Sequence, residues 1–167
     1  IQSTSDQENY LQYAVIAANA PTGVTPEQAA VWAYPMNHEE SISPDALREE
    51  VIFNMVSAML LRIHQSGHLA KLDEERKALV KQALSVYKTI RPDIRVSRPF
   101  WPLGLAGYSD EIVSLGLFVE GKAYLAVWKR SGAAESVTLP ISDAVRTALD
   151  SEKIALSCIY PGPETAE

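Results

Sequence analysis

The sequence predicts an α+β fold, with helices in the first half of the chain and antiparallel strands in the second. The chain has 167 residues, of which 47% are hydrophobic and 22% charged, proportions typical of one globular domain or two small packed ones. Before Arg91 and Pro92 the apolar residues recur with a helical period, and after them they alternate as in strands. We therefore expect helices followed by an antiparallel β domain.

In the first half, the pattern predicts a short helix over residues 10–19 and a short apolar strand over residues 29–34. A long helix is expected from about Pro44 to Ser66, because Ser43, Pro44 and Asp45 supply a capping hydroxyl, a proline at the first helical position and an acid near the positive end of the dipole. Apolar residues cover more than one face of this helix, so it should be buried on several sides. Gly67 would end it in a left-handed conformation.

A further helix is expected to begin at the cap Asp73 and to stop before Pro92, since proline cannot continue the backbone hydrogen bonding. The second half of the chain predicts a hairpin with a turn at residues 120–122. The strands of the hairpin are expected over residues 112–119 and 123–129. Two further strands are expected over residues 137–139 and 154–160, and a short helix or turn over residues 142–149.

Composition excludes two classes of partner. The formal net charge is −6 and the Lys and Arg residues are scattered, whereas a nucleic-acid groove needs clustered cations. The longest apolar stretch, residues 51–63, is interrupted by Asn54, Ser57 and Arg62, so no membrane-spanning helix is expected. The single cysteine, Cys158, suits a reducing, cytoplasmic compartment but leaves the localisation open. The first residues carry neither an initiator Met nor a signal core, so we expect the interior of a longer polypeptide.

Several short motifs follow one another along the first two thirds of the chain. They are TSDQ at 4–7, PEQAAVWAYP at 26–35, NMVSAMLLRIHQSG at 54–67, YKTIRP at 87–92 and PFWPLGL at 99–105. In order and approximate spacing they resemble glycoside hydrolase family 36, the melibiase type of α-galactosidase. The resemblance implies that residues 1–92 are the last strands and helices of a (β/α)8 barrel and that residues 93–167 form a C-terminal antiparallel β-sandwich domain. Since a complete barrel takes ~250 residues, most of it must lie outside this chain.

The resemblance also implies an activity and one catalytic residue. The family hydrolyses terminal α-galactosides, of the melibiose and raffinose type, with retention and without a cofactor or metal. Its general acid/base Asp lies in a Ser-Asp motif at the end of a late barrel strand, and Asp6 is the matching position. The nucleophile would precede Ile1, so the chain alone is expected to be inactive. Residues 5–7 would equally serve as a helix cap, and the two roles can coexist.

Other residues admit both a functional and a structural interpretation. Trp32 could stack on a galactose ring or pack against Tyr10 or the next helix, and for Tyr34 we favour packing. Residues 100–102 could form a sugar platform, but their place at the junction favours a hydrophobic wedge between the two halves. The chain has three histidines, His38, His64 and His68, and two pairs of adjacent glutamates, Glu39 with Glu40 and Glu49 with Glu50. We expect structural histidines rather than a zinc site, and solvated or salt-bridged glutamates.

Two other functions remain open from the sequence. One is a non-catalytic carbohydrate-binding or interaction module that uses the aromatic hairpin, and the other is a related α-N-acetylgalactosaminidase or transglycosylase. The expected partners are an α-galactoside, the missing N-terminal and barrel portion of the enzyme, and a second copy in a homo-oligomer. On this interpretation an isolated chain would expose the apolar faces of the helix around residues 51–63 and associate through them.

Overall fold

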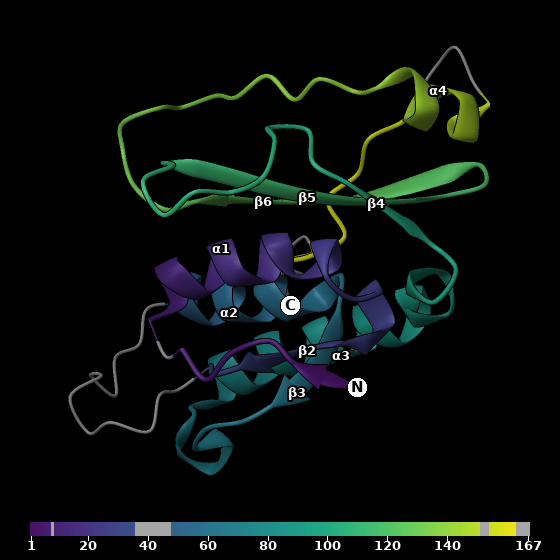
Figure 1. Ribbon diagram of the computed structural model, residues 1–167. Helices are drawn as coiled ribbons and strands as arrows, with labels where there is room; N and C mark the ends of the chain where they lie inside the picture. Colours follow the sequence, from purple (N-terminus) through teal and green to yellow (C-terminus); the bar gives the residue numbers. More distant parts are fainter. Residues whose placement is uncertain (8, 36–47, 151–153, 163–167) are drawn as a thin grey trace.

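The computed structural model describes residues 1–7, 9–35, 48–150 and 154–162, which form two small sheets with helices between them (Figure 1). The first half contains β1 (Gln2–Ser3), α1 (Tyr10–Asn19), β2 (Ala29–Ala33), α2 (Arg48–Met59), β3 (Arg62–Gln65) and α3 (Glu74–Ile94). Short 3-10 turns, η1 (Ala20–Thr22), η2 (Pro26–Gln28) and η3 (Leu69–Lys71), lie between them. The second half contains β4 (Arg98–Phe100), β5 (Ile112–Val119), β6 (Lys122–Lys129) and α4 (Asp143–Leu149).

The first sheet is parallel and its strand order, β1-β2-β3, follows the chain order. A helix connects each pair of strands, and Figure 1 shows both α1 and α2 on the same side of the sheet. Val31 and Ala33 of β2 are fully buried in the core beneath these helices. The arrangement is therefore singly wound, as expected when successive right-handed β-α-β connections advance in one direction.

The second sheet is antiparallel, with the order β4-β5-β6. The predicted hairpin is confirmed: Val119 pairs with Lys122, so the turn consists of Glu120 and Gly121. Gly121 has a φ of +75°, which glycine adopts without a steric penalty. Local turn chemistry and alternating side chains were thus sufficient to predict this hairpin.

One hydrophobic core joins the two halves, and α1 is central to it. Figure 1 shows α1 and α2 between the antiparallel sheet and the parallel sheet. The core cluster includes side chains from both sheets and from the helices: Tyr13, Ala17, Val31, Met55, Leu79, Val113, Leu115, Leu117 and Trp128. The packing of one helix layer between two sheets explains why so many residues of α1 are small or apolar.

The segment after β4 binds the C-terminal end of α1. The Trp101 indole donates to the Ala18 carbonyl at 2.7 Å. The Asn19 amide group donates to the Ala106 carbonyl at 2.7 Å and accepts from the Ala106 N–H at 2.9 Å. Trp101 therefore lies at the junction, as the wedge interpretation expects. Hydrogen bonds hold the two halves together there, in addition to apolar contacts.

Replacing Asn19 by Asp is expected to destabilise the chain by about 1–3 kcal/mol, because a carboxylate cannot donate to the Ala106 carbonyl and repels it. Asn9→Asp is the matched control: Asn9 caps α1 through its side-chain oxygen, which accepts from the Gln12 N–H at 3.1 Å, and Asp retains that acceptor. Urea unfolding of both variants would measure the difference. Equal stabilities would contradict a donor role for Asn19.

Several expected boundaries are wrong. The predicted helix over residues 44–66 ends at Met59, and Arg62–Gln65 is a strand. That strand pairs with β2, and Trp32 is the register partner of His64. The strand pairing outweighs the helical preference of the apolar run before it. Gly67 does have a positive φ, but it follows a strand instead of ending a helix. The predicted helix start at 43–45 lies outside the described residues.

Pro92 does not end α3, which begins at its predicted cap Asp73 and continues to Ile94. Proline removes one backbone hydrogen bond, and contacts of the next residues with the antiparallel sheet offset this loss. Asp93 accepts from the Tyr124 hydroxyl and pairs with the Lys122 ammonium at 2.6 Å. Ile94 is 1% exposed. The last turn of α3 is therefore held by tertiary contacts.

The Asp93 cluster should make stability depend on pH. The hydrogen bonds from Lys122 and Tyr124 lower the pKa of Asp93 below its ordinary value of 3.8. A lowered pKa in the folded chain adds stability above pH 3.8, and this stability is lost as the pH falls further. Asp93→Asn should therefore lower Tm at neutral pH and have a smaller effect at acidic pH. Thermal unfolding across pH tests this, with the exposed Glu120→Gln as control; a Tm difference independent of pH would contradict it.

The C-terminal part of the chain departs from its prediction. Within the described residues, 137–139 and 154–160 form no strand, whereas the short helix or turn expected over 142–149 is a helix, α4. Phe100 belongs to β4, and its ring lies over Gly116 of β5, where a Cβ would overlap it. The Phe100 ring thus packs on its own sheet, which the sequence did not indicate.

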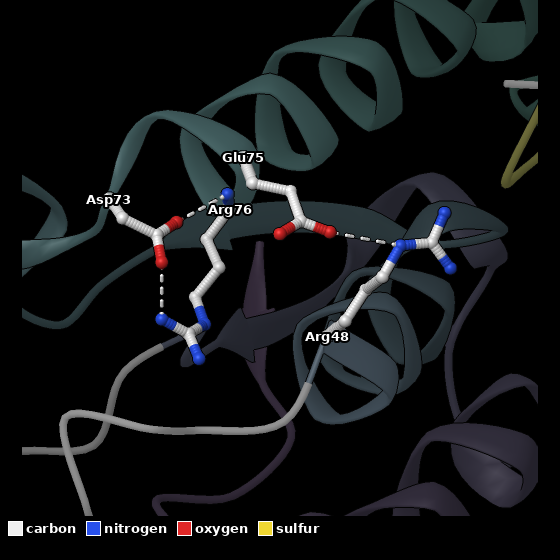
Figure 2. A network of polar contacts seen from close by, with 4 residues as sticks. All are labelled: Arg48, Asp73, Glu75 and Arg76. Atoms are coloured by element: carbon white, nitrogen blue, oxygen red, sulfur yellow. Dashed lines mark hydrogen bonds and ion pairs between the residues drawn. The ribbon is translucent and has the colours of Figure 1, made fainter. Parts of the chain in front are cut away.

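Much of α2 is buried within the described residues, and Ile52, Phe53 and Val56 are partly exposed. Its side chains at Val51, Met55 and Ala58 are fully buried. Figure 2 shows the ion pair that also links α2 to α3, with Arg48 Nε 3.3 Å from a Glu75 oxygen. The same figure shows Asp73 capping α3 through the Arg76 N–H at 2.8 Å.

Candidate active site

Asp6 lies in the loop between β1 and α1, where the chain leaves the parallel sheet. The last backbone bond to β2 runs from the Thr4 N–H to the Ala30 carbonyl at 3.0 Å, and Asp6 is exposed two residues later. The alternative that Asp6 caps the helix is wrong, since α1 begins at Tyr10 and its cap is Asn9. The Asp6 carboxylate is therefore not engaged in capping α1.

Asp6 shares one edge of the sheet with the ends of the other strands, because parallel strands have their carboxyl ends at the same edge. Tyr34 and Ser66 follow β2 and β3 at this edge. The acidic residue Glu27 precedes β2 and so belongs to the opposite edge. The edge that carries Asp6 is the one at which parallel α/β folds bind their ligands.

One face of the parallel sheet carries an aromatic group. The register places Trp32 beside His64, and their rings meet edge to face at a centroid distance of 5.1 Å. The Trp32 indole donates to Ser3 Oγ at 3.3 Å and stacks on Tyr34 at 6.4 Å. Because side chains alternate along a strand, this face is opposite the one that buries Val31 and Ala33 under the helices.

The environment of Trp32 consists of aromatic rings and part of the hydrophobic core. The ring is half-buried and contacts the rings of Tyr34 and His64. Tyr10 instead meets Phe53 of α2 at 5.1 Å. Tyr34 is 9% exposed, in line with the packing role favoured for it. Trp32 packs partly against the core cluster and is more exposed than Tyr34, an arrangement that fits either interpretation.

Other acidic residues lie at the starts of α2 and α3. Asp73 pairs with Arg76, Glu74 with Lys77 at 2.9 Å and Glu75 with Arg48 at 3.3 Å. Glu49 is exposed, and Glu50 is half-buried, so burial raises the pKa of Glu50. Glu50 therefore departs from the solvated carboxylate expected, whereas Glu39 and Glu40 lie outside the described residues.

The histidine interpretation changes with the secondary structure. His64 is on β3 and His68 follows the turn at Gly67, so the two histidines do not share a helix. His38 lies outside the described residues. Within the described ranges, no three His, Cys, Asp or Glu side chains come together in a metal-binding group. His64 instead forms part of the aromatic group around Trp32.

Two comparisons with known proteins give no match: none of the models of protein families fits the chain, and none of the curated proteins is similar to it. Among the helices of the described residues, none has both the length and the apolar character that crossing a membrane requires.

Proposed function

We propose that this chain is the C-terminal portion of a retaining α-galactosidase and that Asp6 is its general acid/base. The observation that carries the proposal is the position of Asp6: an exposed carboxylate at the carboxyl edge of a parallel β-α-β-α-β unit. Catalytic residues of (β/α)8 enzymes come from this edge. The motif resemblance supplies the reaction, and the geometry is compatible with it.

The singly wound sheet supports the assignment to the last part of a barrel. In a barrel, parallel strands follow one another in chain order, and all connecting helices lie outside. The chain has this order, and α1 and α2 both lie on one side (Figure 1). The opposite face, which carries Trp32 and His64, would then face the barrel interior. Parallel sheets are rarely stable with one face uncovered, so further polypeptide is needed there.

The open edge of β1 also supports further polypeptide of the same enzyme as the partner. Within the described residues, β1 pairs with β2 alone. A groove of about 510 Å³ lies beside it, lined by Gln2, Ser3 and Thr4 of the first strand region, by Val15 of α1 and by Tyr108. A preceding strand and helix of the same enzyme would pair with the edge and fill this groove. The partner we propose is thus the remaining barrel, not a separate protein.

Asp6 would act twice in the reaction. In the first step it donates its proton to the glycosidic oxygen while a second carboxylate, ~5–5.5 Å away, attacks the anomeric carbon. The bond to the leaving group breaks and a glycosyl-enzyme forms. Asp6, now ionised, removes a proton from water, which attacks the anomeric carbon and releases galactose with its configuration retained. The nucleophile would come from polypeptide that precedes Ile1 in the longer enzyme.

Trp32 would bind the sugar beside this carboxylate. Galactose has an apolar face of C–H groups, and an indole ring is the side chain best suited to stack on it. The hydrogen bond from the Trp32 indole to Ser3 Oγ and the contact with His64 hold the ring in place. The exact galactoside depends on residues outside this chain, so an α-N-acetylgalactosaminide or a transglycosylation acceptor fits the same two residues.

The test compares the longer enzyme with the 167-residue chain on p-nitrophenyl α- and β-galactosides. We expect the longer enzyme to cleave the α-anomer, to release α-galactose first, and to leave the β-anomer intact, while the chain alone is inert. A longer polypeptide that binds galactosides but hydrolyses none would support the alternative of a carbohydrate-binding module. Hydrolysis by the chain alone would refute the division of the catalytic residues proposed here.

A further inference from the structure

The Tyr13 hydroxyl takes a position in the hydrogen-bond ladder between β1 and β2. The ladder reaches Thr4, whose N–H donates to the Ala30 carbonyl at 3.0 Å. Trp32, two residues further along β2, has its N–H on the same side of the strand. That N–H donates to the Tyr13 hydroxyl at 2.7 Å. The hydroxyl therefore replaces the bond that β1 would provide if it continued beside β2.

The same hydroxyl also contacts the loop that carries Asp6. Having accepted the Trp32 N–H, it can donate its one proton either to the Ser5 carbonyl at 3.2 Å or to Thr4 Oγ1 at 3.2 Å. Thr4 Oγ1 in turn donates to the Ala30 carbonyl at 2.9 Å. A single oxygen atom thus connects the backbone of β2 with the residue directly before Asp6.

The position of this oxygen is set by the core. Tyr13 is 1% exposed and belongs to the cluster that α1 forms with both sheets. Burial is the main cause that raises the pKa of Tyr13, and the nearby Asp6 carboxylate adds to the rise. The hydroxyl stays protonated and can both donate and accept. Because the Tyr13 ring is held rigidly by the packing of α1, its hydroxyl can fix the position of the exposed loop that carries Asp6.

We propose that Tyr13 is a positioning residue of the active site: its hydroxyl holds the Ser5 carbonyl and the Trp32 N–H, and so fixes Asp6 relative to the Trp32 ring. The inference rests on the proposed function, since it concerns the same carboxylate. Without the hydroxyl the chain from Ser5 onward loses its attachment to β2. Asp6 then donates its proton less effectively, because small displacements of a catalytic group are costly.

The activity test uses Tyr13→Phe in the longer enzyme, which removes the oxygen and keeps the ring. Methyl α-galactoside needs its leaving group protonated, whereas 2,4-dinitrophenyl α-galactoside does not. We expect kcat/KM to fall by about 10- to 100-fold for the first substrate and by less than about threefold for the second. Tyr124→Phe is the matched control: it also loses one hydrogen bond, to Asp93, on the remote hairpin. It should affect both substrates equally and slightly.

A second test does not depend on activity. Amide hydrogen exchange of the longer enzyme, followed by mass spectrometry on peptides that contain Trp32, should be at least about tenfold faster at Trp32 in Tyr13→Phe and unchanged there in Tyr124→Phe. An equal loss of kcat/KM on both substrates, or unchanged exchange at Trp32, would overturn the inference while leaving the α-galactosidase assignment intact. A longer enzyme without activity on α-galactosides would overturn the proposed function, and the role of Tyr13 in catalysis with it.

Discussion

Asp6→Ala in the longer enzyme should lower kcat for methyl α-galactoside by about 10²- to 10⁴-fold, the usual contribution of general acid–base catalysis. The leaving methoxide needs a proton that alanine cannot supply. For 2,4-dinitrophenyl α-galactoside the first step should proceed, but the glycosyl-enzyme should accumulate because no base activates water. The predicted result is therefore a burst of dinitrophenolate followed by slow turnover, measured by stopped-flow absorbance.

Azide separates the acid/base role from that of a nucleophile. Azide attacks without a base, so it should restore turnover of Asp6→Ala on the activated substrate. Attack on the glycosyl-enzyme gives α-galactosyl azide, with the configuration of the substrate, whereas azide replacing a lost nucleophile would give the β-anomer. Glu135→Ala, which removes an exposed carboxylate on the segment after β6, is the control and should behave as wild type. A β-product would refute the assignment of Asp6, and full activity of Asp6→Ala would refute any catalytic role.

Elements with strong local signals could be predicted from the sequence. The cap Asp73, the helix over Tyr10–Asn19 and the hairpin around Gly121 each depend on residues that are close together in the chain. Capping, helical periodicity and turn chemistry act over a few residues, so they can be recognised without the tertiary structure. These elements form the frame on which both sheets assemble.

The elements that were missed depend on pairing across the chain. Gln2–Ser3, Arg62–Gln65 and Arg98–Phe100 are strands of a few residues, and each exists because a neighbouring strand supplies its hydrogen bonds. The strand expected over 137–139 fails for the same reason, since alternation without a partner does not form a sheet. Pro92 was misjudged because the contacts of Asp93 with the hairpin cannot be inferred from a local rule.

The candidate site was only partly predictable. Asp6 and Trp32 came from motif resemblance; local physics alone would have favoured a helix cap for Asp6, and for Trp32 it did not separate stacking on a sugar from packing. Tyr13 gave no signal, because an aromatic on the buried stripe of a helix is normally a core residue. The role of its hydroxyl arises because β1 and β2 separate after Thr4, and the sequence does not reveal where they separate.

Arg130→Ala should produce the largest loss of stability among the substitutions considered outside the site. The Arg130 guanidinium lies at the end of β6 and donates to backbone carbonyls. Its acceptors are Leu11 at 2.6 Å, Asp110 at 2.6 Å, Tyr108 at 3.1 Å and Gly107 at 3.3 Å. The first of these belongs to α1 and the others to the loop before β5. One side chain thus joins the start of the central helix to the antiparallel half.

The expected cost of Arg130→Ala is about 3 kcal/mol, because charged hydrogen bonds are lost and partly buried carbonyls are left without a donor. For a chain of this size that corresponds to a fall in Tm of roughly 6–12 °C. Arg130→Lys should recover only part of the loss, since an ammonium lacks the planar fork that reaches several carbonyls at once. Lys129→Ala, at the exposed neighbouring position, should change stability by less than about 0.5 kcal/mol. If Arg130→Ala melted like Lys129→Ala in calorimetry, the carbonyl contacts would not hold the two halves together, and packing around α1 alone would have to do so.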